Sequence, residues 1–133
     1  MKRYLTALGV AWAMAATGCS EPAAPASVTF SAQLANAGST DRAMLVQLVG
    51  ADTSARIDSV LAPAGSTYRL FTQRLSSTRW RAIITGHLSD GALLRLAVPG
   101  KAQPSAYTAA ILDVADASFA TLLPGSRAVT IAR

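Results

Sequence analysis

Short runs in which apolar and polar residues alternate recur along the chain from residue 28 to its end. Val28, Phe30, Ala32 and Leu34 alternate with polar residues, which is typical of a strand with one buried face. Similar runs between turn residues predict further strands at 57–61, 68–73, 79–84, 92–98, 107–114 and around 129–131. The run 43–49 is almost continuously apolar, which predicts a strand covered on both faces. The chain is therefore expected to be all-β.

The turn signals favour one architecture within this class. Gly or Pro residues separate the runs about every 8 to 12 residues, a spacing typical of β-sandwiches. We predict a small β-sandwich of the jelly-roll or Ig-like type over residues 28–133. One alternative stays open, because residues 105–123 are rich in Ala and place Tyr107, Ile111 and Val114 at helical spacing behind Ser105, a possible N-cap. A helix there would replace one strand.

The first residues have the composition of an export signal. Lys2 and Arg3 give a positive start, and an uncharged, largely apolar run follows from Tyr4 to Ala16. This run is shorter than the roughly 18 to 20 apolar residues of a membrane-spanning helix. It ends at Ala16-Thr17-Gly18-Cys19, which resembles the lipobox of bacterial lipoproteins, although the family usually has Leu where this chain has Ala16. The resemblance implies that residues 1–18 are a cleaved signal peptide and that Cys19 is lipidated. Ordinary signal-peptidase cleavage is the alternative.

Cys19 is the only cysteine, so no intramolecular disulfide can form. Acylation explains it better than a free thiol does, because acyl chains hold a protein at a membrane. Residues 19–27 are rich in Pro, Ala and Ser, which predicts an extended tether between the lipidated Cys19 and the domain at 28–133. By resemblance to lipoproteins of Gram-negative bacteria, Ser20 after the cysteine implies retention at the outer membrane. We therefore expect a protein of the cell envelope that faces the periplasm or the surface.

Three segments of the second half of the chain carry another resemblance. They are Gly91-Ala-Leu-Leu-Arg-Leu-Ala-Val98, Ala106-Tyr-Thr-Ala-Ala-Ile-Leu-Asp-Val114 and Gly125-Ser-Arg-Ala-Val-Thr-Ile-Ala132. Their order resembles the last strands of cohesin-like bacterial modules, which are jelly-roll-like β-sandwiches. The resemblance covers the last third to half of the chain and implies a protein-binding or carbohydrate-associated module rather than an enzyme. It assigns no partner-contacting residue in this chain.

The charge pattern adds a candidate binding surface. Lysine and arginine together number 12 against 7 acidic residues, and this modest excess shrinks further if Lys2 and Arg3 leave with the signal, so no nucleic-acid partner is expected. Four arginines lie at outward positions of predicted strands: Arg69, Arg79, Arg81 and Arg95. We expect them to form a positive stripe that docks lipid head groups, an acidic glycan or an acidic envelope protein. The alternative is that they keep a sheet soluble and protect its edges.

The aromatic residues leave a similar choice. Tyr68, Phe71, Trp80 and Tyr107 would make a sugar-stacking platform if several of them shared one exposed face. Trp80 fits the core of a small sandwich better, because large aromatic side chains usually anchor such cores.

Few residues suggest catalysis or metal binding. His87, the only histidine, lies near Ser89 and Asp90, but no nucleophile-elbow motif is present, so we interpret it as a solvated loop residue. Zinc needs several His or Cys ligands, which the chain lacks. Asp113 and Asp116 are close enough in sequence to suggest calcium, but aspartates that bond the backbone of a turn explain them better.

The sequence predicts no cofactor, no metal and no enzyme activity. It favours a non-catalytic binding or assembly module, with a structural or accessory lipoprotein as the alternative and a small hydrolase behind both.

Overall fold

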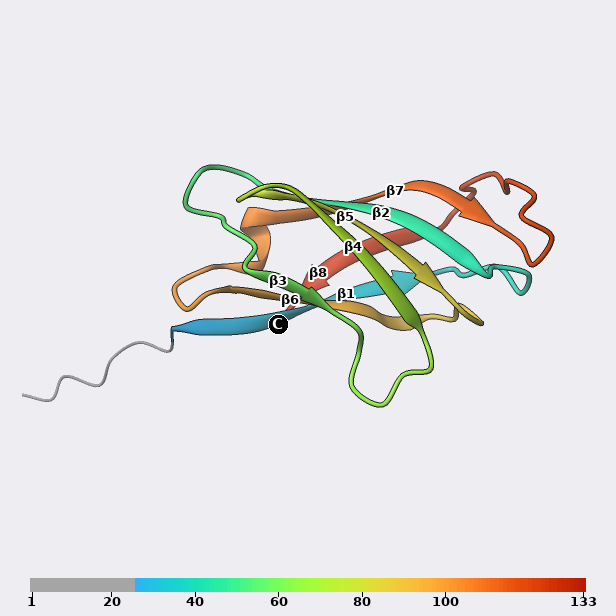
Figure 1. Ribbon diagram of the computed structural model, residues 1–133, viewed down its shortest axis with the longest axis horizontal. Helices are drawn as coiled ribbons and strands as arrows, with labels where there is room; N and C mark the ends of the chain where they lie inside the picture. The colour runs from blue at the N-terminus through green and yellow to red at the C-terminus, as the bar shows by residue number, and fades with distance from the viewer. Residues whose placement is uncertain (1–25) are drawn as a thin grey trace, which may run out of the picture.

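The computed structural model describes residues 26–133, so the predicted signal peptide, Cys19 and most of the predicted tether lie outside the described residues. The described chain forms eight strands in two four-stranded antiparallel sheets that pack face to face (Figure 1). The strands are β1 (Ser27–Ala35), β2 (Ala43–Gly50), β3 (Ser59–Leu61), β4 (Arg69–Ser76), β5 (Arg79–Thr85), β6 (Gly91–Pro99), β7 (Tyr107–Ala115) and β8 (Ala128–Ala132). The predicted all-β fold, a small β-sandwich, is confirmed.

The strand order places most neighbours in sequence on opposite sheets. One sheet has the order β3-β6-β1-β8 and the other the order β4-β5-β2-β7. We call them the β1 sheet and the β2 sheet. Only the β4–β5 connection is a hairpin within one sheet, and every other connection crosses between the two layers. The two sheets are therefore interleaved along the chain, because each contains strands from both halves of it.

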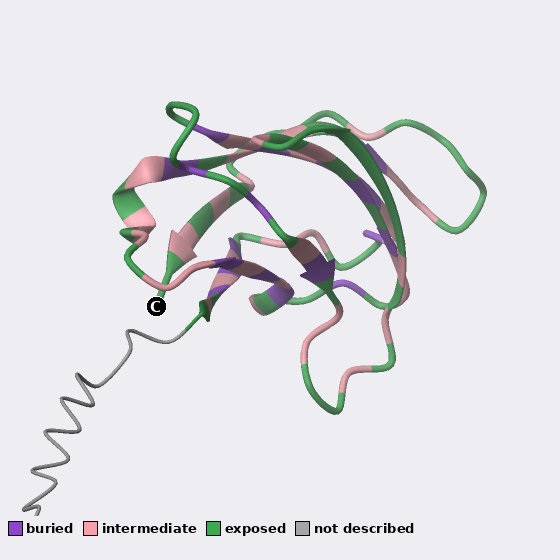
Figure 2. Ribbon diagram, turned by 60° about the vertical axis from the view of Figure 1, so that its left-hand side comes forward, coloured by how far each residue is buried: buried purple, intermediate pink, exposed green. Residues whose placement is uncertain are grey.

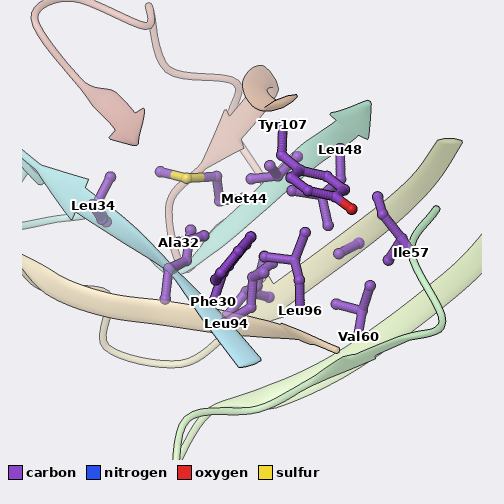
Figure 3. Packing of buried hydrophobic residues seen from close by; sticks show 14 of the residues in the cluster. Phe30, Ala32, Leu34, Met44, Leu48, Ile57, Val60, Leu94, Leu96 and Tyr107 are labelled. Carbon is purple, nitrogen blue, oxygen red and sulfur yellow. The ribbon is translucent and has the colours of Figure 1, made fainter. Parts of the chain in front are cut away.

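Alternation along the strands produces the core. The predicted inward residues Phe30, Ala32 and Leu34 of β1 are buried, and so are Leu94, Leu96 and Val98 of β6 (Figure 3). The other buried apolar side chains are Met44, Val46, Leu48, Ala55, Ile57, Val60, Ala82, Ile84, Leu88, Leu93, Tyr107 and Val114. Figure 2 shows the result as strands banded alternately by burial. Burial of this apolar surface is the main force that holds the two layers together.

The structure corrects one prediction and resolves one alternative. β2 is covered on one face only, because Met44, Val46 and Leu48 are buried whereas Leu45, Gln47 and Val49 are half-exposed. The helix considered for residues 105–123 is wrong. A single turn of 3-10 helix, η1 (Pro104–Ala106), is followed directly by strand β7. Backbone pairing with β2 along the whole of β7 outweighs the helical preference of its alanines.

Two aromatic side chains secure the crossing from β2 to β3. The Tyr107 hydroxyl donates a hydrogen bond to the carbonyl oxygen of Arg56 at 2.9 Å, and the indole Nε1 of Trp80 donates to the carbonyl oxygen of Ile57 at 3.1 Å. The Tyr107 ring also packs edge-on against Phe30 with 5.8 Å between the ring centroids. These contacts let both aromatic side chains pack against the core with their polar atoms satisfied.

The start of β1 and the loop after β7 lie at opposite ends of the sandwich (Figure 1). β1 therefore begins at one end of the domain, and the segment between β7 and β8 closes the other end. Within the described part of the chain, no helix has the length and apolar character needed to cross a membrane.

Candidate functional site

The outward face of the β2 sheet carries the features that suggest binding. Strand register defines its rows, because residues directly opposite each other in antiparallel strands point to the same face. One row runs from Phe71 on β4 through Ile83 on β5 to Leu45 on β2. We call these three residues the apolar row. Asp113 of β7 lies at its far end.

Two of the three side chains in the apolar row are strongly exposed to solvent. Phe71 is 59% exposed and Ile83 is 43% exposed, whereas Leu45 is half-buried between its neighbours. An open hollow of about 290 Å³ lies on this face and is lined by Leu45, Phe71, Thr72, Gln73, Arg81 and Ile83. Adjacent exposed apolar side chains around a hollow mark an interaction surface more often than single scattered ones do.

Arginines border the apolar row on both sides. Arg69 lies two residues before Phe71 on β4, and Arg81 lies two residues before Ile83 on β5, so the two guanidinium groups extend from opposite sides of the row. The backbone position of each arginine is about 6 to 7 Å along its strand from the apolar row. Arg79 continues the positive charge along β5, opposite Val49. The three residues Arg69, Arg79 and Arg81 therefore share one face, as the sequence predicted.

The fourth arginine of the predicted stripe is separated from the others. Arg95 lies on β6 in the β1 sheet, on the other layer of the sandwich, so its grouping with the other three was wrong. Its Nε donates a hydrogen bond to the carbonyl oxygen of Ala62 at 3.0 Å, and the residue is half-buried. It holds the segment after β3 in place and contributes nothing to the positive face of the β2 sheet.

Negative charge on this face is sparse. Asp113 is the only carboxylate among the residues of β4, β5, β2 and β7, and it lies on the strand farthest from β4. The ion pairs within residues 26–133 join Arg56 to Asp58 and Arg127 to Asp41, and neither involves the arginines beside the apolar row. We call the surface formed by Arg69, Arg79, Arg81 and the apolar row the arginine face. Its charges are available for an external anion.

The aromatic platform considered from the sequence does not form. Tyr107 is 4% exposed in the core, and Trp80 is half-buried and points inward, so both support the fold. Tyr68 packs against the core, and its hydroxyl accepts a hydrogen bond from the backbone N–H of Ser89 at 3.2 Å. Phe71 alone contributes an exposed aromatic ring to the arginine face.

The residues near His87 form hydrogen bonds that stabilise loops. Asp90 accepts a hydrogen bond from the backbone N–H of Ala37 at 2.7 Å and so joins two loops, while Ser89 contacts Tyr68. His87 itself is exposed, and no hydrogen bond connects its side chain to any described residue. The arrangement contains no nucleophile held against a base.

The aspartates considered for calcium are split between a strand and a turn. Asp113 lies on β7, whereas Asp116 accepts hydrogen bonds from the backbone N–H groups of Ser118 at 2.8 Å and Ala120 at 3.1 Å. Asp116 therefore bonds its own turn, as the sequence interpretation favoured. Within residues 26–133, no three acidic, histidine or cysteine side chains gather as metal ligands would.

Sequence reasoning missed a buried ion pair between Asp41 and Arg127. Arg127 donates from Nε to Asp41 Oδ2 at 2.6 Å and from Nη2 to Oδ1 at 2.7 Å, and the Gly38 N–H donates to Oδ2 at 2.8 Å. Asp41 is 0% exposed. The Arg127 hydrogen bonds hold the pKa of Asp41 below its ordinary value. The pair joins the loop before β2 to the loop before β8. Because the two residues are 86 positions apart, no local pattern could have predicted the pair.

Comparison with protein-family models, with curated proteins and with solved structures finds no match to this chain. The arginine face therefore has to be interpreted from its own geometry and chemistry.

Proposed function

We propose that the protein is a lipid-anchored lipoprotein of the bacterial cell envelope that binds an anionic envelope component, a protein or an acidic glycan, through the arginine face. Binding is non-catalytic, and the domain acts as a recognition or assembly module. The lipobox-like Ala16-Thr17-Gly18-Cys19 segment supports the anchor, with cleavage after residue 18 and acylation of Cys19. The outer membrane is the proposed location.

The observation that carries the binding proposal is the position of the apolar row between arginines. Phe71 and Ile83 would be removed from water by a partner, which stabilises a complex in proportion to the apolar area covered. Arg69 and Arg81 would pair with anionic groups at the border of the same contact. An apolar centre with a charged rim is the usual composition of a protein-binding surface.

The same arrangement disfavours a purely solubilising role for the arginines. Arginines that protect a sheet belong on its edge strands, but Arg79 and Arg81 lie on β5, which is paired on both sides. A surface that served solubility alone would also not place Phe71 and Ile83 beside them. Binding explains both features together.

Affinity capture tests the proposal. Full-length protein in detergent is used to retain components of solubilised envelope at low and high salt, in parallel with Arg79→Ser/Arg81→Ser and with a control, Lys101→Ser/Arg133→Ser, that removes two exposed positive charges elsewhere. We expect a defined component that the wild type and the control retain at low salt, and that the Arg79→Ser/Arg81→Ser variant releases. Retention should weaken at high salt, because exposed charges are screened beyond about 10 Å at 0.1 M salt. Equal retention by all three proteins would contradict the proposal.

A further inference from the structure

β4 is the long open edge of the sandwich. It forms one border of the β2 sheet and pairs with β5 along one side only, so its other side presents backbone N–H and C=O groups along eight residues. Such an edge is a template for a further strand.

The other three sheet edges are less suitable. β3 has three residues and β8 has five. The edge at β7 is partly occupied, because Ala115 pairs with Thr121 and the Leu122 N–H donates to the carbonyl oxygen of Val114 at 2.8 Å. Among the described strands, β4 alone combines length with an uncovered side.

The side chains of β4 define the chemistry of an added strand. Arg69, Phe71 and Gln73 point to the arginine face, because their partners Thr85, Ile83 and Arg81 alternate with the buried Ala82 and Ile84 of β5. Arg74 lies on the opposite face of β4, near the hairpin. An added strand would therefore meet positive charge near both ends and an exposed ring between them.

Charge complementarity selects an acidic strand over a second copy of this chain. Edge-to-edge pairing of two copies would bring Arg69 and Arg74 of both molecules to one seam, with Arg79 and Arg81 on the next strand, β5. Asp113 on the far strand is the only carboxylate on the strands of this sheet. Like charges at close range oppose such pairing. A segment that carries carboxylates at its ends and apolar residues in its middle would satisfy the same groups.

We propose that the anionic partner is a protein and that an extended acidic segment of it adds to β4 as a further strand of the β2 sheet. This inference rests on the proposed function and specifies how the arginine face is used. Backbone hydrogen bonds to β4 supply the pairing, the arginines select carboxylates, and the hollow beside Phe71 receives an apolar side chain of the partner.

A designed peptide tests the pairing. The sequence Ser-Glu-Thr-Val-Ile-Val-Glu-Ser places one Glu opposite Arg74, Ile opposite Phe71 and the other Glu opposite Arg69 when it runs antiparallel to β4. The control peptide carries Lys in place of both Glu. We expect fluorescence anisotropy with full-length protein in detergent to show that the acidic peptide binds at least about tenfold more tightly than the Lys peptide. Hydrogen exchange of the β4 amides should slow in the complex.

Backbone methylation separates strand addition from simple charge attraction. Two further acidic peptides carry N-methyl groups on alternate residues, in the odd or in the even positions. Alternate N–H groups of a strand point to opposite edges, so methylation in one set should reduce affinity at least about tenfold while the other set has a smaller effect. Equal affinity of both methylated peptides with the parent would overturn strand addition. It would leave side-chain binding by the arginine face, and hence the proposed function, in place.

Charge reversal gives a test that does not depend on loss of binding. Arg69→Glu/Arg74→Glu should bind the Lys peptide more tightly than the acidic one, which a misfolded variant would not do. Lys101→Glu/Arg133→Glu changes the net charge equally away from β4 and should keep the preference of the wild type. An unchanged preference in Arg69→Glu/Arg74→Glu would overturn the proposal. So would a wild-type dimer in sedimentation that dissociates in this variant, because a second copy would then occupy the edge.

Discussion

Replacement of Arg127 by methionine should strongly destabilise the domain. Methionine keeps an apolar stem of similar length but leaves the carboxylate of Asp41, which is 0% exposed, without its ion-pair partner. The variant also loses the hydrogen bonds from Nη1 to the carbonyl oxygens of Leu123 at 2.6 Å and Pro124 at 3.1 Å. Removal of one partner of a buried ion pair costs about 3–5 kcal/mol.

That cost is large beside the total stability of a small domain, which is about 5–15 kcal/mol. For a domain of this size each kcal/mol lowers Tm by about 4–8 °C, so Arg127→Met should lower Tm by about 15 °C or more. The Gly38 N–H continues to donate to Asp41, which keeps the expected cost at the lower end of the range. Urea unfolding of the full-length protein in detergent, followed by tryptophan fluorescence, measures the free energy of unfolding directly.

Two further variants make the reasoning refutable. Arg133→Met removes an exposed arginine and should leave the unfolding midpoint unchanged. Asp41→Asn/Arg127→Met removes both charges and should be more stable than Arg127→Met alone, because no unpaired buried charge remains. A loss below about 1 kcal/mol in Arg127→Met would refute the argument. The single variant Asp41→Asn completes the comparison. Additive effects of Asp41→Asn and Arg127→Met on the free energy of unfolding would also refute the argument, because two residues that form a pair should show a coupling energy.

Four other measurements follow, three from the structure and one from the sequence. Arg127 lowers the pKa of Asp41 in the folded state, so the stability that their pair contributes is complete above about pH 4 and is lost as the pH falls through that lowered pKa. The urea midpoint should therefore drop more steeply below about pH 4 in the wild type than in Asp41→Asn. Parallel pH profiles of the two proteins would contradict this. Gly50→Ala should cost about 1–3 kcal/mol of unfolding free energy, because the new Cβ would overlap the carbonyl oxygen of Ala55; an unchanged urea midpoint would be the contrary result. Phe71→Ser should change the unfolding free energy by no more than about 0.5 kcal/mol, since the ring is 59% exposed, and a larger loss would assign the ring to the core. Cys19→Ser should abolish incorporation of an alkyne-tagged fatty acid in cells, whereas continued incorporation would exclude lipidation at this residue.

Alternation predicted the strands well because it reports a local property. A residue that faces the core must be apolar, and the next one must tolerate water, so Phe30 and Leu96 could be placed inward from the sequence alone. The segment at β7 was ambiguous, since its alanines suit a helix intrinsically and only pairing with β2 makes it a strand.

Alternation does not say which sheet a strand joins. Arg81 and Arg95 both point outward from their strands, but β5 and β6 belong to opposite layers, so the predicted stripe lost one member. The same limit affected β2, whose outward apolar residue Leu45 resembles a core residue in the sequence. Its exposure became evident only when β5 and β7 were placed on either side of it. The Asp41–Arg127 pair joins residues that are far apart in the sequence, so no local sequence pattern predicts it.

The most direct test of binding through the arginine face is site-specific photo-cross-linking in bacterial cells that express the full-length chain. A photoreactive amino acid replaces Phe71 or Ile83 on the arginine face, and Thr130 at an exposed position of β8 on the other sheet. The proposal predicts the same discrete adduct from positions 71 and 83, loss of that adduct when Arg79→Ser/Arg81→Ser is added, and no such adduct from position 130. Absence of an adduct at both 71 and 83, or an equal adduct at 130, would contradict it.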